Sequence, residues 1–257
     1  MSADARDSIV PSNLPKLVRK IRERTPARLL NGRVGAAYRT QTQIELREAH
    51  AAARDAVRAE MSLATVFDAA FTKRWELFEV HTMAVSKEDF LLRPDLGRHF
   101  SDSSRATIQE SCPPGCDLQI AIGDGLSVPA VAAQVPSLMQ ILGEGARARG
   151  WKTGRTFAIR HCRVGILNEI GELLGPRVAV LLIGERPGLA TAESLSAYMA
   201  YRPRKLHTDA NRNLISNIHA RGIHSADAAS RVLSLAARMM KAGASGYTIK
   251  EDRRELS

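Results

Sequence analysis

Hydrophobic and polar residues follow two different spacings along this chain, and the change between them divides it. Near the N-terminus, apolar side chains recur every three or four positions, which predicts amphipathic helices. Farther along, short apolar runs end in glycine and are followed by helical patterns. A repeated order of strand, glycine turn and helix is typical of an open α/β sheet. We therefore expect helices first and an α/β domain after them.

The first predicted helix carries one apolar stripe. Its members are Leu14, Leu17, Val18 and Ile21. Ser12 is a suitable N-cap, and Pro15 fits the first turn. We expect residues 1–12 to be disordered.

A second, longer helix is expected to begin near Thr42, because residues 42–45 (TQIE) have the spacing of a capping box. Small and apolar side chains then follow one face of this helix as far as Met61. We interpret residues 13–73 as a helical extension and residues 74–257 as the α/β domain.

Two apolar runs predict central strands of a sheet. Residues 118–122 alternate as in a strand and end in a Gly-Asp-Gly turn, after which a long helix is expected over 128–149. Residues 177–183 are apolar apart from the first, which is typical of a strand buried on both faces of a parallel sheet. This run also ends in a glycine loop, residues 184–188 (GERPG).

Weaker patterns complete the predicted order. Strands are expected at 75–81, 156–159 and 246–250, and helices at 102–110, 169–174 and 225–241. Ligands of open α/β sheets bind at the carboxyl ends of the strands. We therefore expect the loops 123–127 and 184–188 to lie at the same edge.

These two loops hold the polar residues best placed for a ligand. The first leads into a helix N-terminus, where free N–H groups favour a polar or anionic ligand, with Asp124 and Ser127 beside it. A tight turn in which Ser127 only caps the helix explains the same pattern equally well. In the second loop Glu185 is favoured as a hydrogen-bond acceptor for amides or hydroxyls, and an internal Glu185–Arg186 pair is the alternative.

Composition narrows the function classes. The chain has no run of eighteen apolar residues and no signal-peptide pattern, so we expect a cytoplasmic protein without a membrane span. No hydrolase or metalloprotease motif occurs among the 257 residues, and the seven histidines are scattered, so we expect no catalytic residue and no metal site. The three cysteines are an odd number, and Cys112 and Cys116 lack a second pair, which favours ordinary reduced thiols over a metal site.

The formal net charge of +10 leaves two kinds of partner open. The excess of basic residues gathers near the N-terminus and in one later loop: Lys16, Arg19, Lys20, Arg22, Arg24, Arg28, Arg202, Arg204 and Lys205. No aromatic residues are interleaved for base stacking, so a solvated or partner-facing surface is favoured. A basic nucleotide- or nucleic-acid-binding module remains the alternative, followed by a structural partner that touches no ligand.

Several motifs, taken in order, resemble a known family. They are residues 124–127 (DGLS), 168–171 (NEIG), 184–189 (GERPGL), 193–198 (ESLSAY) and 211–218 (NRNLISNI), with 25–28 (TPAR), 32–35 (GRVG) and 50–57 (HAAARDAV) upstream. Together they resemble the small subunit of ethanolamine ammonia-lyase from about residue 14 to the end. The resemblance implies a Rossmann-like, mainly parallel sheet with an N-terminal helical extension.

The resemblance also implies a function. The family's enzyme converts ethanolamine to acetaldehyde and ammonia with adenosylcobalamin, which carries the radical chemistry. A large TIM-barrel subunit is expected to bind the substrate and catalyse the reaction, and the small subunit to help hold the cofactor between the two. A hexamer of large–small pairs is implied, in the cytoplasm, with packaging into a protein-shelled microcompartment left open. No nucleic-acid or membrane partner is expected.

The family's cofactor contacts fall on Val164, Glu185 and Leu214 of this sequence. By resemblance, Val164 packs on the corrin or its nucleotide tail, and Glu185 accepts hydrogen bonds from amide side chains or ribose. The family has Cys at the position of Leu214 and often Asp at that of Asn168; an apolar contact survives the first change, and the hydrogen-bonding shape survives the second. The chain has no Asp-x-His-x-x-Gly motif, which favours cobalamin bound with its own base on cobalt.

Overall fold

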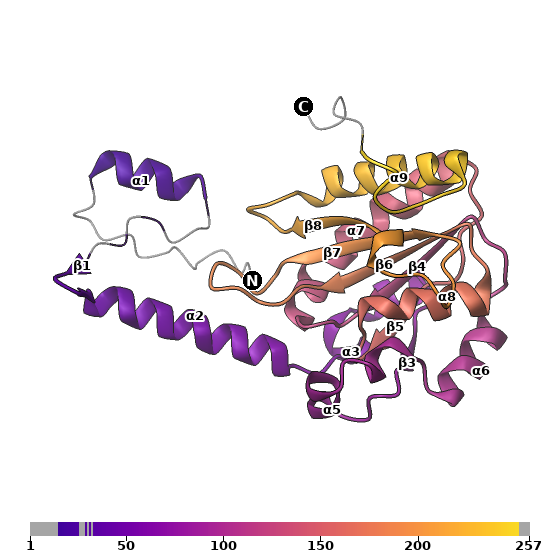
Figure 1. Cartoon of the computed structure of the whole chain (residues 1–257), viewed down its shortest axis with the longest axis horizontal. Helices are drawn as coiled ribbons and strands as arrows, with labels where there is room; N and C mark the ends of the chain where they lie inside the picture. The colour runs from indigo at the N-terminus through magenta and orange to yellow at the C-terminus, as the bar shows by residue number, and fades with distance from the viewer. Residues whose placement is uncertain (1–14, 26–28, 30, 32, 252–257) are drawn as a thin grey trace.

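A six-stranded sheet forms the centre of the computed structural model, which describes residues 15–25, 29, 31 and 33–251 (Figure 1). The strand order is β3-β5-β4-β6-β7-β8. The first four strands in this order are parallel, and β7 and β8 continue the sheet in antiparallel fashion. Their bounds are β3 Phe78–His81, β4 Leu118–Gly123, β5 Phe157–Arg160, β6 Val178–Gly184, β7 Leu195–Tyr201 and β8 Asn213–Ile218. The expected open, mainly parallel α/β sheet is confirmed.

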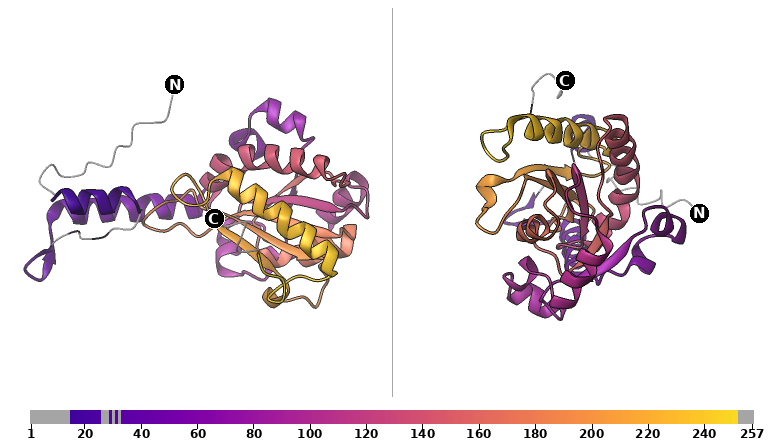
Figure 2. Two further views of the ribbon diagram at one scale, coloured as in Figure 1. Left: turned by 90° about the horizontal axis from the view of Figure 1, so that it is seen from above. Right: turned by 90° about the vertical axis from the view of Figure 1, so that its right-hand side faces the viewer.

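Helices cover both faces of the sheet. The larger core packs α7 (Val128–Ala148) and α9 (Ser225–Ala242) against one face, and a second core packs α6 (Asp102–Ser111) and α8 (Leu167–Leu174) against the other (Figures 1 and 2). Every residue of β4 and β6 is buried, which explains why these two strands are almost continuously apolar. The predicted helices at 102–110, 128–149, 169–174 and 225–241 are confirmed within one or two residues at each end.

The residues before β3 form helices and one short hairpin. Their bounds are α1 Lys16–Glu23, β1 Arg33–Val34, β2 Ala37–Tyr38, α2 Thr40–Arg58, α3 Leu63–Val66 and α4 Ala69–Arg74. Figure 2 shows α2 projecting from the α/β body as an arm. The arm joins the body where the Glu60 carboxylate accepts hydrogen bonds from Arg160 and from the His161 ring, each at 3.0 Å, and where Met61 enters the larger core.

Two details of the expected helix starts are wrong. The N-cap of α2 is Arg39 and not Thr42, which is the third residue of the helix; its hydroxyl donates to the carbonyl oxygen of Asn31 at 3.5 Å instead. Pro15 is the N-cap residue of α1 and not part of its first turn. Ser12 and the expected disordered stretch 1–12 lie outside the described residues.

The closing strand expected at 246–250 is also wrong, since these residues form a turn. The side-chain amide of Asn213, at the start of β8, donates to the carbonyl oxygens of Gly246 and Ile249 at 3.1 and 2.6 Å. A side chain therefore holds this segment where a backbone ladder was expected. The strands β7 and β8, which the hydrophobic pattern did not predict, take the outer places of the sheet.

Short helices connect the remaining elements. They are α5 Lys87–Leu92 and the three 3-10 helices η1 Leu96–Arg98, η2 Val164–Ile166 and η3 Asp209–Asn211. The strand expected at 75–81 is shorter than predicted, because Trp75 ends α4 and β3 begins at Phe78. Among the described helices, none is both long enough and apolar enough to cross a membrane.

The two glycine loops lie at the same edge of the sheet, as expected, because β4 and β6 are parallel neighbours. The Leu126 N–H donates to the Gly184 carbonyl oxygen at 3.1 Å. Gly125 has φ of +54°, and an added Cβ would overlap the Gly184 carbonyl and lie 2.6 Å from Cγ1 of Ile183. The glycine at position 125 thus allows one loop to pack on the other, and this close approach needs no ligand.

Replacing Gly125 tests this contact. We expect Gly125→Ala to lower the free energy of unfolding by about 3 kcal/mol, of which about 1 kcal/mol is the left-handed backbone and the rest steric overlap. The control is Gly175→Ala: Gly175 has φ of +55° but nothing within 4 Å of an added Cβ, so only the loss of about 1 kcal/mol is expected. Equal losses in urea denaturation would show that the two loops do not constrain each other.

The three cysteines are buried free thiols. Cys112 donates to the Arg155 carbonyl at 3.6 Å, and Cys116 to the side-chain oxygen of Gln119 at 3.7 Å. Burial raises the pKa of Cys112 to about 11 and the pKa of Cys162 well above its ordinary value. Within the described part of the chain, no group of three His, Cys, Asp or Glu side chains is arranged to hold a metal ion.

These thiols should be unreactive in the folded protein. At pH 8, a thiol with a pKa of about 11 is ionised in only about one molecule in a thousand, and the thiolate is the reactive form. We expect Ellman's reagent to modify less than one thiol per folded chain within minutes, and all three in denaturant. Rapid modification of two thiols without denaturant would contradict the interpretation of the three cysteines as buried, unreactive thiols.

Candidate functional site

Val164 lies at the carboxyl edge of the sheet, in η2 directly after β5. Its side chain is half-buried against the second core. Three and two residues earlier, the backbone N–H groups of His161 and Cys162 donate to the Asp124 carboxylate at 2.9 and 2.8 Å. The backbone leading to Val164 is therefore held by the glycine turn that follows β4.

Asp124 is fully buried, so it is not an exposed ligand group. Besides the two backbone N–H groups, it accepts a hydrogen bond from Nζ of Lys87 at 3.4 Å. Ser127 is equally buried: it caps α7 by accepting from the Ala130 N–H at 3.2 Å, and its hydroxyl donates to the Ala192 carbonyl. The interpretation of this loop as a tight turn in which Ser127 caps the helix is correct. The nucleotide- or nucleic-acid-binding alternative, which rested on the net charge and on the glycine loops, loses the support of Asp124 and Ser127.

Glu185 follows β6 and joins three segments of the outer sheet. Its Oε1 accepts hydrogen bonds from the Ser196 hydroxyl at 2.6 Å and the Asn217 backbone N–H at 2.9 Å, and its Oε2 accepts from the Ser194 hydroxyl at 2.7 Å. The alternative Glu185–Arg186 ion pair does not form within the described residues. A carboxylate has about four acceptor positions, so Oε2 keeps one position for a further donor.

Leu214 lies within β8, an edge strand of the sheet, and the residue is 44% exposed. Its cross-strand neighbour is Tyr198 of β7, which in turn pairs with Leu181 of β6. Tyr198 and Leu181 both belong to the core on the α8 side. Leu214 therefore continues this row on the same face of the sheet, beyond the part that α8 covers.

The three residues predicted to contact the cofactor are therefore not equally close to one another. Val164 and Glu185 share the carboxyl edge, whereas Leu214 lies farther out and within a strand. Burial lowers the pKa of Arg163, which precedes Val164, and the positive charge of Arg186, which follows Glu185, lowers it further.

This surface also contains residues that the sequence pattern did not single out. We call the set formed by Glu185, Ser196, Tyr198, Arg212 and Leu214 the β7–β8 strip. All five lie inside motifs of the resemblance, but nothing in their spacing marks them as neighbours. They become neighbours through the antiparallel pairing of β7 with β6 and β8.

Asn168 of α8 supports one end of the strip. Its amide nitrogen donates to the His207 carbonyl at 2.8 Å, and its oxygen accepts from Nη2 of Arg212 at 3.0 Å. Aspartate would keep the second bond but has no hydrogen for the first. The Arg212 side chain is only 6% exposed and also pairs with Asp209. Arg212 is therefore a buried member of the strip that holds its neighbours in place.

His219 lies beside Glu185 and is not a free ligand. Its Nδ1 accepts from the Arg221 N–H at 3.2 Å, so its Nε2 donates to the side-chain oxygen of Asn217 at 2.8 Å. Burial lowers the pKa of His219 below its ordinary value, which keeps the ring neutral. Both ring nitrogens are used, and the ring fixes the side chain of Asn217.

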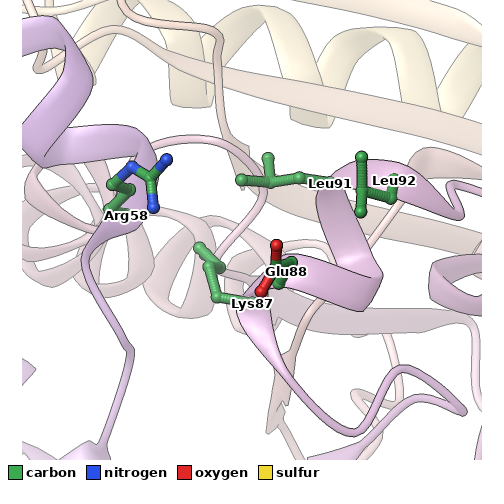
Figure 3. Close-up of a pocket in the computed structure, with 5 residues that line it drawn as sticks. All are labelled: Arg58, Lys87, Glu88, Leu91 and Leu92. Carbon is green, nitrogen blue, oxygen red and sulfur yellow. The ribbon is translucent and has the colours of Figure 1, made fainter.

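A small depression lies elsewhere, between the end of α2 and α5 (Figure 3). It measures about 190 Å³ and is lined by Arg58, Lys87, Glu88, Leu91 and Leu92. Pockets that enclose a small molecule usually measure about 300–1,000 Å³. The depression contains none of the residues of the β7–β8 strip.

The sequence of this chain matches one protein family over nearly its whole length. The family is described as ethanolamine ammonia-lyase light chain (EutC), and the match covers residues 15–250. The chain is 39% identical over 231 residues to the ethanolamine ammonia-lyase small subunit of Clostridium perfringens, covering 90% of this chain and 76% of the relative.

Two further relatives carry the same name. The chain is 38% identical over 252 residues to the protein of Pseudomonas syringae pv. tomato, covering 97% of this chain and 87% of the relative. It is 38% identical over 226 residues to that of Clostridium acetobutylicum, covering 88% of this chain and 91% of the relative. With the family match and these identities, the chain belongs to the ethanolamine ammonia-lyase small-subunit family.

Proposed function

We propose that this chain supplies one wall of the adenosylcobalamin site of an ethanolamine ammonia-lyase, and that a larger partner subunit supplies the other wall and the substrate site. The support is the membership in the small-subunit family together with the position of Val164, Glu185 and Leu214 on one partly exposed surface. When bound, adenosylcobalamin supplies the radical chemistry that turns ethanolamine into acetaldehyde and ammonia. This chain binds and orients the cofactor, and the large subunit, a TIM barrel in a hexamer of large–small pairs, acts on the substrate.

The residues of the surface fit such a cofactor. Val164 and Leu214 offer apolar contact area, and the free position on Oε2 of Glu185 accepts a hydrogen bond from an amide or hydroxyl group. Leucine at position 214, where the family has Cys, keeps an apolar contact. The position is partly exposed, so the larger side chain has room there. The exposure of Leu214 agrees with a cofactor that is enclosed only when a second subunit covers the strip.

The Glu185 contact is tested by Glu185→Gln. The amide oxygen of glutamine still accepts from the Asn217 N–H and the Ser196 hydroxyl. The NH₂ group that replaces Oε2 donates to the Ser194 hydroxyl oxygen, so the fold is retained and the free acceptor is lost. In the complex with the large subunit, we expect the affinity for cyanocobalamin to fall about tenfold, measured by absorbance titration, because a hydrogen bond to a charged group is lost. The matched control is Glu193→Gln, the same change at an exposed position before β7.

The outcomes separate the residue from the function. Equal affinities of the two variants would exclude Glu185 as a ligand. If the wild-type complex took up no cobalamin and formed no acetaldehyde with adenosylcobalamin and ethanolamine, the proposed function itself would be wrong.

A further inference from the structure

Tyr198 occupies the middle of the β7–β8 strip. Its neighbours across the sheet are Leu181 on one side and Leu214 on the other. One part of its ring packs with the core under α8, and the residue as a whole is half-buried. The ring therefore presents its other part beside the exposed Leu214, since directly opposed side chains on one face of a sheet lie in contact.

The hydroxyl of Tyr198 is a polar group of the strip that the protein itself leaves unused. Among residues 15–25, 29, 31 and 33–251, no side chain or backbone group bonds to it, whereas Ser196 donates to Glu185 and Arg212 is held by Asp209 and Asn168. Buried tyrosines usually find a partner for this hydroxyl, and a partly exposed one bonds to solvent or to a ligand.

The charges around Tyr198 determine what its hydroxyl offers. Burial raises the pKa of Tyr198, and the negative charges of Glu185 and Asp209 raise it further, against the effect of Arg212. The phenol therefore stays protonated at neutral pH and is a hydrogen-bond donor. On the same strip Glu185 offers an acceptor, so the strip presents one donor and one acceptor in addition to the apolar side chain of Leu214.

We propose that Tyr198 is a further cofactor-binding residue, whose ring extends the apolar surface of Leu214 and whose hydroxyl donates to a carbonyl or phosphate oxygen of the bound cobalamin. The proposal rests on the proposed function. Cobalamin suits this pattern, because its corrin ring is flat and apolar on its faces and carries amide groups at its rim. An amide group at the rim accepts from Tyr198 through its oxygen, and another donates to Glu185 through its nitrogen.

The variant Tyr198→Phe removes only the oxygen atom. Because the hydroxyl has no partner in the described protein, the fold and the melting temperature should not change. In the complex with the large subunit, we expect the affinity for cyanocobalamin, measured by absorbance titration, to fall about tenfold.

The matched control is Tyr201→Phe. Tyr201 lies three residues away on β7, packs with the larger core on the opposite face of the sheet, and should bind cobalamin as the wild type does. If Tyr198→Phe also bound cyanocobalamin with wild-type affinity, the role of Tyr198 would be overturned while the proposed function stood. If the wild-type complex itself took up no cyanocobalamin, both would fall together.

Discussion

The buried carboxylate of Asp124 is the contact on which the carboxyl edge of this sheet depends. A charge without access to water is tolerated only when it is paired and hydrogen-bonded. Here the ammonium group of Lys87 and the backbone N–H groups of His161 and Cys162 satisfy it. These donors come from the segments that follow β3 and β5, so one carboxylate joins three loops. Val164 follows Cys162 by two residues, and its place at the edge results from this junction.

A second carboxylate continues the edge toward the outer strands. Glu185 joins the end of β6 to β7 through Ser196 and to β8 through the backbone of Asn217. The ladder between β7 and β8 is irregular at this point, and Asn217 has φ of +62°, a conformation that asparagine tolerates better than most residues. The acceptor proposed for the cofactor therefore also positions the strand that carries Leu214. The Glu185 side chain thus provides the acceptor and also fixes the position of the apolar Leu214.

Local pattern was sufficient for the centre of the sheet and not for its outer part. The strands β4 and β6 are buried on both faces, so their apolar runs are visible in the sequence. The strand β8 has one exposed face and an irregular pairing, and its apolar residues, Leu214, Ile215 and Ile218, do not alternate regularly with polar ones. The turn at 123–125 looked like a ligand loop because its partner Lys87 is 37 residues away in sequence. The burial of Asp124 depends on residues that are distant in sequence, so the local spacing of residues cannot predict it.

The same reasoning explains which residues of the candidate surface the sequence identified and which ones only the structure did. Resemblance marked Val164, Glu185 and Leu214, but only strand pairing places Tyr198 between Leu181 and Leu214. The resulting strip is exposed at Leu214, since β8 is the last strand on its side of the sheet and no described helix covers this residue. An exposed apolar row on an edge strand is a liability for a chain in water unless another surface covers it. A flat cofactor with a second subunit behind it is one such cover, and it would turn an open row into an enclosed site.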